Sequence, residues 1–374
     1  MTINREIAVV GAGIGGLAVA LACAQRGATV QVYEQARALN EVGAGIQISP
    51  NGMNVLVALG LADDIRATTM RTSAINLRDY RQGRLVSHLD LLKHGQPAGH
   101  YAIHRGDFVE KLYQACLATG VSFQFGNDVE LLPSDKRVVI AADGVNSKHR
   151  SKFINDEKST FSGQVAWRAT VKNTHELPAI STVHLAPSRH LVTYPLWQGN
   201  LINIVAVQER SIWADSGWSM TDDPENLRDA FDDFAPEVCE ILGRIDDCFV
   251  WGLHNFPAEK QWYTGNMALL GDAVHPMLPF MAQGANMALE DAWILATCLA
   301  RFEGNSDAFA AYQKARSLRV DHVVAASSRN AAAFHLSGVK RSIAHTVLRT
   351  ADKIAPSVGI KRLDWLYGYD AAKY

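Results

Sequence analysis

The sequence lacks the features that mark disulfide-rich, metal-binding, membrane-spanning and nucleic-acid-binding proteins. Its five cysteines form no CxxC pair and no metal-ligand spacing, so neither a disulfide framework nor a metal site is expected. No apolar run reaches the ~18 residues of a membrane-spanning helix. A net charge of -2 provides no global basic field for nucleic acid. A strand expected within the first residues leaves no room for a signal peptide, so the cytoplasm is the expected location.

The sequence also lacks any Pro/Gly/Ser linker, internal repeat or low-complexity tract that would separate its domains. Its 374 residues exceed one typical domain and predict about two or three. Domain boundaries therefore have to be placed from the positions of motifs. The basic cluster at 148–152 is expected to be a solvated helix start rather than a polyanion site.

What the sequence does contain is a dinucleotide-binding fingerprint near its start. A buried strand is expected over Glu6–Val10, and glycines then occupy the three fingerprint positions of the segment 11–16. Helical spacing continues to a stop at Gly27. A second strand over 28–33 ends in Glu34, 18 residues after the last fingerprint glycine and close to the ~20 expected for a ribose-binding acid. This complete βαβ context predicts a site for an ADP moiety.

The fingerprint alone does not separate NAD from FAD, and a second motif far along the chain decides between them. No second fingerprint occurs downstream, which disfavours a reductase with two dinucleotides. An apolar strand is expected over 267–270, followed by Asp272 and then by a helix that begins at Gly284. An acid at the carboxyl end of a strand can accept a hydrogen bond from a ribityl or ribose hydroxyl. The helix start suits a flavin ring that becomes anionic on reduction, so FAD is the expected cofactor.

Three further segments fit the same cofactor. The segment 43–51 has glycines that let the backbone approach a ring, with Asn51 as a helix cap, although a plain hairpin or loop fits equally well. Arg105 opens an amphipathic helix and could bind a pyrophosphate or ribityl oxygen, although a surface arginine would look the same. An expected strand over 138–142 leads into Asp143-Gly144, which taken singly is usually a turn. Together the segments favour a cofactor site.

These motifs resemble those of class A flavoprotein aromatic hydroxylases, the group of salicylate hydroxylase, 3-hydroxybenzoate 6-hydroxylase and 6-hydroxynicotinate 3-monooxygenase. The resemblance runs almost end to end. It rests on GxGxxG at 11–16, on Asp143-Gly144…Ser147…Arg150, and on Gly271-Asp272 with His275-Pro276 and Gln283-Gly284.

The resemblance implies an α/β fold. A Rossmann-like FAD-binding domain is interleaved with a β-sheet substrate domain, as in p-hydroxybenzoate hydroxylase, and a helical segment follows at the C-terminus. The FAD-binding domain is expected over 1–70, 100–155 and 265–325. The substrate domain is expected over 71–99 and 156–264, and the helical extension over 326–374.

The resemblance also assigns site residues. The Asp143 segment would lie near the flavin and the passing nicotinamide, Asp272 would bind the ribityl chain, and the segment 284–287 would contact the pyrimidine edge. The cofactor-binding residues expected from the motifs and the resemblance are Gly11, Gly13, Ile14, Gly15, Gly16, Glu34, Gln35, Gly45, Gln47, Arg105, Asp143, Gly144, Asp272, Pro276, Gly284, Ala285 and Asn286.

Substrate contacts are expected on a strand over 188–196. Residues four apart in a strand point to one face, so His190 and Tyr194 can line one cavity wall. In similar hydroxylases a histidine and a tyrosine at these places meet the substrate hydroxyl and carboxylate, whereas an isolated pair would more often be satisfied by core partners. Trp167-Arg168 is expected on a neighbouring strand, and whether Arg168 is structural or positions an anionic substrate stays open.

The implied function is that of an FAD-dependent, NAD(P)H-consuming monooxygenase. It would hydroxylate a small phenolic acid of the salicylate or hydroxybenzoate type, with O2 adding to reduced flavin to give a C4a-hydroperoxide. His190 would serve as base or hydrogen-bond partner for the phenol, and Tyr194 would orient it. Open alternatives are a hydroxynicotinate-type hydroxylase, an NAD-dependent dehydrogenase, an epoxidase or lipid-acting monooxygenase, and a non-catalytic flavin-binding protein.

Four features of the sequence leave questions open. The segment 128–137 is shorter than is usual in similar hydroxylases, and Phe280 stands where others carry Gln or His, which predicts a more apolar pocket. Helical spacing over 320–351 predicts a helix that crosses the FAD domain or forms a dimer contact, so a homodimer is one expectation. The aromatic segment 365–370 is expected to dock back onto the body. Nothing distinguishes NADH from NADPH.

Overall fold

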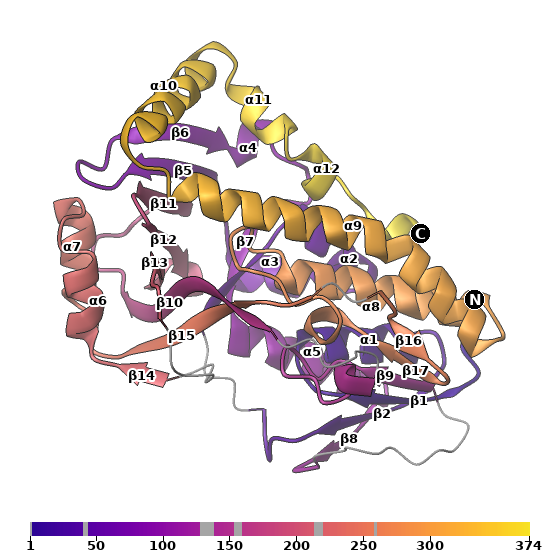
Figure 1. Cartoon of the computed structure of the whole chain (residues 1–374). Helices are drawn as coiled ribbons and strands as arrows, with labels where there is room; N and C mark the ends of the chain where they lie inside the picture. Colours follow the sequence, from indigo (N-terminus) through magenta and orange to yellow (C-terminus); the bar gives the residue numbers. More distant parts are fainter. Residues whose placement is uncertain (1, 40–43, 128–137, 153–158, 213–219, 258–259) are drawn as a thin grey trace.

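The computed structural model describes residues 2–39, 44–127, 138–152, 159–212, 220–257 and 260–374, which form two large sheets surrounded by helices (Figure 1). The shortened segment 128–137 and the predicted domain boundary at 155/156 lie outside these residues. The division into domains therefore stays a prediction.

The first sheet carries the predicted βαβ unit. Its strand order is β16-β17-β9-β1-β2-β8, and all its neighbours are parallel except the edge pair β16–β17. The strands are β1 (Glu6–Val10), β2 (Thr29–Glu34), β8 (Ser122–Phe125), β9 (Val138–Ala141), β16 (Tyr263–Thr264) and β17 (Met267–Leu269). Central strands of a parallel sheet are covered on both faces, and the apolar runs of β1, β9 and β17 are buried accordingly. The helices α1 (Ile14–Ala24), α5 (Arg105–Ala118) and α8 (Gly284–Arg301) belong to this layer, where α1 contacts both α5 and α8.

The register of this sheet brings three distant segments to one edge. Val10 of β1 pairs with Ala141 of β9, and Ala141 pairs in turn with Leu269 of β17. Because the three strands run parallel, the residues that follow them leave the sheet side by side. The fingerprint loop at 11–16, the Asp143 turn and the Asp272 turn are therefore neighbours.

The second sheet has eight strands in the order β14-β15-β10-β13-β12-β11-β5-β6. They are β5 (Ala74–Asp79), β6 (Leu85–Asp90), β10 (Thr160–Lys172), β11 (Ile180–Ala186), β12 (Arg189–Leu196), β13 (Leu201–Glu209), β14 (Met220–Asp222) and β15 (Cys248–Asn255). The helices α6 (Pro224–Ala230) and α7 (Pro236–Leu242) pack on it through a core that includes Trp167 and Phe231. The expectation that Trp167-Arg168 lies on the strand next to β12 is wrong, because β13 separates β10 from β12.

A small third sheet joins the two large ones. It consists of β3 (Gly45–Ile48), β7 (Tyr101–His104) and β4 (Met70–Arg71), with α2 (Pro50–Ala58), α3 (Ala62–Thr68) and α4 (Leu91–His94) nearby in sequence. The prediction that Asn51 caps a helix is wrong, because α2 begins at Pro50 with Ser49 in the capping position. The buried amide of Asn51 instead donates to Gln283 at 3.0 Å and to Glu290 at 2.7 Å. It thereby fastens α2 to α8.

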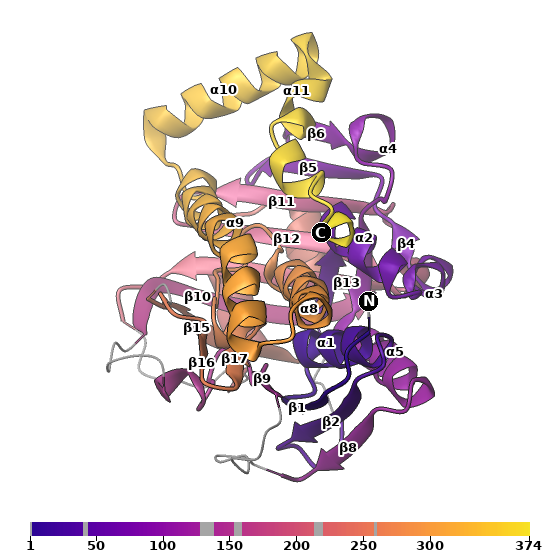
Figure 2. The same cartoon turned by 90° about the vertical axis from the view of Figure 1, so that its right-hand side faces the viewer.

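The C-terminal part is helical, but the single helix expected over 320–351 is two helices. The long helix α9 (Asn305–Phe334) ends at Phe334 and is followed by His335, and α10 (Gly338–Ile354) begins at a glycine with a φ of +54°. The chain closes with α11 (Pro356–Lys361), α12 (Asp364–Tyr367) and a final turn η4 (Ala371–Lys373). Figure 2 shows α9 beside α8 and α10 projecting at the top of the view.

The aromatic C-terminal segment docks onto the body as expected, because Leu366 and Tyr367 are buried. By contrast, α10 exposes Val339, Ile343 and Val347, and a dimer contact there stays a prediction. Among the described helices, none is both long and apolar enough to cross a membrane.

The interface between α8 and α9 contains a buried ion network that the sequence did not suggest. Arg316 donates from Nε to Asp291 at 2.7 Å and from Nη1 to Glu290 at 2.5 Å, and all three side chains are fully buried. Nε2 of His275 contacts the same Asp291 carboxylate at 2.5 Å. Burial would raise the pKa of Asp291, but His275 and Arg316 outweigh burial and hold it at about 2. The network ties both helices to the segment that follows β17.

We expect Arg316→Met to destabilise the protein by about 3–5 kcal/mol, because the change removes the buried arginine from Asp291 and leaves Glu290 with Arg319 alone. The matched control is Arg66→Met, which breaks an exposed pair with Asp63 on α3 and should cost less than about 1 kcal/mol. Urea unfolding at neutral pH measures both free energies. A loss below about 1 kcal/mol for Arg316→Met would contradict the role of the network.

The same network predicts a pH dependence. The folded pKa of Asp291 lies below its unfolded value of ~3.9, so its stabilising contribution is present above that value and is lost as the pH falls toward about 2. The stability deficit of Arg316→Met should therefore shrink over this acidic range. A deficit that stays constant from neutral pH down to about 2 would contradict the electrostatic cause.

Candidate active site

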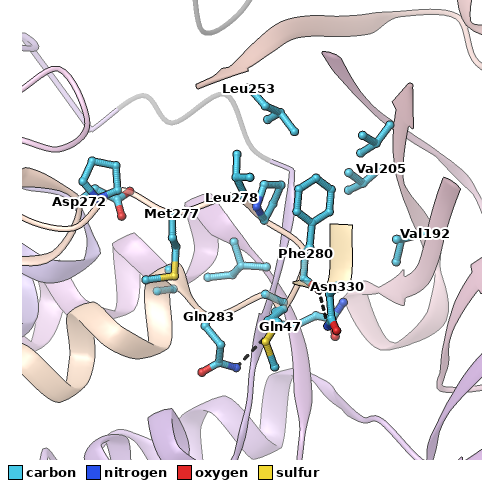
Figure 3. A pocket seen from close by; sticks show the side chains of 18 of the residues that line it. Gln47, Val192, Val205, Leu253, Asp272, Met277, Leu278, Phe280, Gln283 and Asn330 are labelled. Atoms are coloured by element: carbon cyan, nitrogen blue, oxygen red, sulfur yellow. Dashed lines mark hydrogen bonds between the residues drawn. The ribbon is translucent and has the colours of Figure 1, made fainter. Parts of the chain in front are cut away.

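A cavity of about 720 Å³ lies between the edge of the first sheet and one face of the second. Figure 3 shows Asp272 and Met277 toward one end, Val192 and Val205 on the strands at the other, and Phe280 between them. The predicted residues that line the cavity are Gly13, Ile14, Gly15, Gly45, Gln47, Arg105, Gly144, His190, Tyr194, Asp272, Pro276, Gly284 and Ala285.

The glycines of the first-sheet edge form a cradle that fits FAD. A Cβ built on Gly11 would lie 2.5 Å from the carbonyl oxygen of Ala142, and one on Gly16 would lie 1.9 Å from that of Gly11. These two glycines are needed for the tight turn and for close packing of helix on strand. Around Gly13 and Gly144, by contrast, a Cβ would meet no atom within 4 Å. The open space at these lining positions is where a dinucleotide backbone can approach the chain.

Two helix starts face this cradle. Gly13, Ile14 and Gly15 begin α1, while Gly284 and Ala285 begin α8, and all five line the cavity. Neither helix has a side-chain cap or an acidic residue in its first turn. Their N–H groups and positive dipole ends therefore suit a pyrophosphate and a reduced flavin ring.

Asp272 faces the cavity from the turn η3 (Gly271–Ala273). Burial raises its pKa above the ordinary value and nearby Asp291 adds to this, while His275, Arg105 and Arg150 oppose it. Its carboxylate oxygen Oδ1 lies 3.9 Å from the position that a Cβ on Gly284 would occupy. The side chain is thus placed to accept a hydrogen bond from a hydroxyl between β17 and the start of α8.

The Asp143 motif braces this turn. Arg150 donates from Nε to the carbonyl oxygen of Ala273 at 2.8 Å and from Nη2 to that of Asp272. Asp143 accepts from His149 Nδ1 at 2.8 Å, and both His149 and Arg150 are buried. The expectation that the cluster 148–152 is a solvated helix start is therefore wrong at these two residues. Asp143 Oδ1 and His149 Nε2 are buried without a partner in the described part of the chain.

Several predicted cofactor residues lie outside the cavity lining. Gly11 and Gly16 serve the backbone turn, and Glu34 accepts hydrogen bonds from the N–H groups of Ala12 and Ala36, each at 2.8 Å. Gln35 is exposed beside it.

Asn286 is also outside the lining. It is fully buried. Its side-chain nitrogen donates hydrogen bonds to the carbonyl oxygens of Gln47 and Ala282, and its side-chain oxygen accepts one from the N–H of Ser49. Its side chain holds β3 against α8 and is not available to a ligand.

The opposite wall of the cavity is the second sheet, where His190 and Tyr194 project from β12. Nδ1 of His190 lies 2.8 Å from Nε2 of His335, and the Phe280 ring lies 5.4 Å from the His190 ring. Tyr194 donates its hydroxyl proton to the carbonyl oxygen of Gly45 at 2.6 Å. Because its proton is committed there, Tyr194 can only accept a hydrogen bond from a ligand.

Arg168 shares the face of His190 and Tyr194, although β13 lies between their strands. Val205 of β13 pairs with Arg168 on one side and with Val192 on the other, and all three line the cavity. Directly paired residues point to one face, and so do alternate residues along a strand. Arg168 therefore lies two strand spacings, about 10 Å, from β12.

The guanidinium of Arg168 has no carboxylate partner among the described residues. It stacks over the Trp251 ring at 4.6 Å, and its Nε is buried without a hydrogen bond. Burial lowers its pKa, Tyr194 opposes this, and the neighbouring Arg105 lowers it further. An unpaired cation in a cavity wall is a binding group for an anion. The sequence left the role of Arg168 open because only the strand register brings it beside His190.

Comparisons with known proteins agree with this geometry. The model of the FAD binding domain family matches residues 4–139 and 136–327. A 3-amino-4-hydroxybenzoate 2-monooxygenase of Streptomyces platensis is 33% identical, with 99% of this chain and 98% of the relative covered. A 6-hydroxynicotinate 3-monooxygenase of Pseudomonas fluorescens is 31% identical, with 99% and 96% covered.

A solved salicylate hydroxylase substrate complex superposes with a TM-score of 0.80 at 23% identity, covering 99% of this chain and 96% of that chain. The fold predicted from the sequence, a Rossmann-like FAD-binding unit interleaved with a β-sheet unit, is thereby confirmed. The family match and the full-length relatives show that this chain belongs to the FAD-binding-domain family and is an FAD-dependent aromatic-ring monooxygenase of the class A flavoprotein hydroxylase type.

Proposed function

We propose that this monooxygenase hydroxylates a small phenolic acid of the hydroxybenzoate type, with NADH or NADPH as reductant and O2 as oxidant. The observation that carries the proposal is that His190 and Arg168 lie on one face of the second sheet, where Arg168 has no carboxylate partner among the described residues. The separation of their strands, about 10 Å, suits one aromatic ring that bears a hydroxyl and a carboxylate. The curated relative from Streptomyces platensis, named for such a substrate, supports this choice.

His190 is the proposed base for the substrate hydroxyl. Burial and the neighbouring His335 hold its pKa well below the ordinary value, so the ring is neutral near pH 7. Nδ1 faces His335, and Nε2 has no partner among the described residues, which leaves this nitrogen for a ligand. A phenol has a pKa of ~10, and removal of its proton pushes charge onto the ortho and para carbons. A base that assists this step activates the ring for electrophilic hydroxylation.

Arg168 is the proposed anchor for the substrate carboxylate. Its planar guanidinium can make two parallel hydrogen bonds to a carboxylate, and no protein acid competes in the described part of the chain. Tyr194 would accept a hydrogen bond rather than donate one, because its proton goes to Gly45. Arg168 and Tyr194 would together fix the position of the substrate ring relative to His190.

FAD would be held by the lining residues of the first-sheet edge. The start of α1 at Gly13 would meet the pyrophosphate, Asp272 the ribityl chain, and the start of α8 at Gly284 the flavin ring. When bound, FAD would supply the redox chemistry between NADH or NADPH and O2. The protein orients the substrate, excludes water and manages the phenolic proton.

A hydroxypyridine carboxylate is the second candidate, because it presents the same hydroxyl and carboxylate and one relative is named for such a substrate. The wall between His190 and Arg168 favours the hydroxybenzoate. It is apolar at Phe280, Val192 and Val205, so a pyridine nitrogen buried there would lose hydrogen bonds to water.

We expect Asp272→Ala to weaken FAD binding about 10- to 100-fold, because a hydrogen bond to a charged group contributes ~1.5–3 kcal/mol. Asp64→Ala, at an exposed position on α3, is the matched control and should bind FAD like the wild type. The 450 nm absorbance of the purified proteins and titration with FAD measure the effect. Full retention of the yellow cofactor by Asp272→Ala would contradict the assignment.

We expect His190→Gln to lower the rate of ring hydroxylation about 10²- to 10⁴-fold, the usual contribution of a general base. FAD content should stay normal, and reductant oxidation should become uncoupled from product formation. The matched control is His322→Gln at an exposed position on α9. Unchanged hydroxylation, coupling and pH dependence in His190→Gln would remove His190 from the mechanism.

We expect Arg168→Met to raise KM for the carboxylated substrate about 10- to 100-fold, because the methionine keeps apolar contact with Trp251 but cannot bind the carboxylate. The internal control is the corresponding phenol without a carboxylate, whose KM should change little. Steady-state kinetics with both compounds measure the difference. Equal effects on the two compounds would show that Arg168 does not bind the carboxylate.

A further inference from the structure

A continuous chain of polar contacts leads from the cavity wall to the protein surface. Nδ1 of His190 lies 2.8 Å from Nε2 of His335, and Nδ1 of His335 lies 2.8 Å from Oε1 of Glu209. The side chain of His335 is 2% exposed, whereas that of Glu209 is 47% exposed. The chain therefore begins at a buried ring that lines the cavity and ends in solvent.

Two consecutive strands and the end of a distant helix build this chain. His190 stands on β12, Glu209 is the last residue of β13, and His335 follows the end of α9. His190 pairs across the sheet with Val207, which lies two residues before Glu209, so both polar side chains are on the face that borders the cavity. The end of α9 places the His335 ring between them.

The contacts fix the positions of the protons. Glu209 is a carboxylate that accepts from its neighbour, so His335 carries its proton on Nδ1 and presents a lone pair at Nε2. The longer contact of 3.5 Å between Gln164 and Nδ1 does not compete with this bond. Nε2 of His335 therefore accepts from Nδ1–H of His190, and Nε2 of His190 keeps its lone pair for the cavity.

Both histidines are suited to passing a proton rather than keeping it. Burial lowers the pKa of His335, although Glu209 partly offsets the effect, and burial with His335 lowers that of His190 further. The ring centroids of Phe280 and Phe334 lie 5.4 and 5.2 Å from that of His190, so two apolar rings pack against the imidazole. A charge left on His190 would thus be unfavourable, and the proton needs a way out.

We propose that His335 and Glu209 form a proton outlet that carries the phenolic proton of the substrate from His190 to solvent. The inference rests on the proposed role of His190. The substrate O–H bond breaks as an Nε2–H bond forms on His190, and Nδ1–H of His190 passes to Nε2 of His335. Nδ1–H of His335 then passes to Glu209, which releases the proton to water. Both rings end neutral with their tautomers exchanged, and reprotonation of the product phenolate along the same path restores them.

His335 and Glu209 are positioning residues in this scheme, because neither lines the cavity. His335→Gln is the most direct variant, since its amide can accept from His190 and donate to Glu209 but cannot pass a proton between them. Glu209→Gln changes a half-exposed side chain and preserves its shape, so it remains informative if the buried variant folds poorly. Glu110→Gln, an exposed glutamate on α5, is the matched control.

The experiment mixes the oxidised FAD-loaded protein with 3-hydroxybenzoate or 4-hydroxybenzoate in weak buffer that contains a pH indicator. Stopped-flow absorbance follows the bound phenolate and the released proton together. We expect His335→Gln to slow both signals at least about tenfold with normal FAD content. Glu209→Gln should delay proton release, and added imidazole should restore it, while Glu110→Gln should match the wild type.

Three results would overturn the proposal in different ways. Wild-type rates in both His335→Gln and Glu209→Gln, with a slow His190→Gln, would exclude the outlet and leave the base in place. Wild-type rates in all three variants would remove the base and the outlet together. A loss of FAD or of substrate affinity in His335→Gln, with proton release in Glu209→Gln unchanged, would show a purely structural role and also overturn the outlet.

Discussion

The structure depends on one constraint, the alignment of the carboxyl ends of β1, β9 and β17. Because Val10, Ala141 and Leu269 are in register, three loops meet at one sheet edge, although the first and the last are more than 250 positions apart in the sequence. Each loop brings a different part of the cradle: open backbone at Gly13, a bracing arginine at Arg150, and an acid at Asp272. None of them would form a dinucleotide site alone. The parallel sheet is thus the element that turns several weak motifs into one cofactor site.

The buried arginines of the protein differ in whether they are paired with carboxylates. In the α8–α9 interface Arg316 and Arg319 meet the carboxylates of Glu290 and Asp291, so two cations balance two anions. In the cavity wall Arg168 meets no carboxylate among the described residues, so its charge is available to a ligand. His190 lies between these extremes, neutral and connected through His335 to a half-exposed acid. This distribution supports a site that binds an anion at one end and removes a proton at the other.

The sequence predicted the local elements well, because their signals are local. The strand over Glu6–Val10, the helix after it and the helix from Gly284 follow from glycine turns and apolar spacing. It did not predict the relations that depend on register. Arg168 is two strands from His190 rather than one, the helix expected over 320–351 breaks at His335, and the amide of Asn286 is used by backbone groups. The proposed outlet could not be predicted from the sequence for the same reason, since no sequence spacing links β12 and the end of β13 to the end of α9.

The central claim is that an FAD site and a phenolic-acid site meet in one cavity. The most direct measurement supplies the FAD-loaded protein with NADH or NADPH, O2 and a panel of hydroxybenzoates and hydroxynicotinates, and scores hydroxylated product beside reductant oxidation. The account predicts that at least one hydroxybenzoate stimulates reductant oxidation and is hydroxylated in close to equal amount. FAD-loaded protein that neither consumes reductant faster nor forms a hydroxylated product with any member of the panel would contradict it.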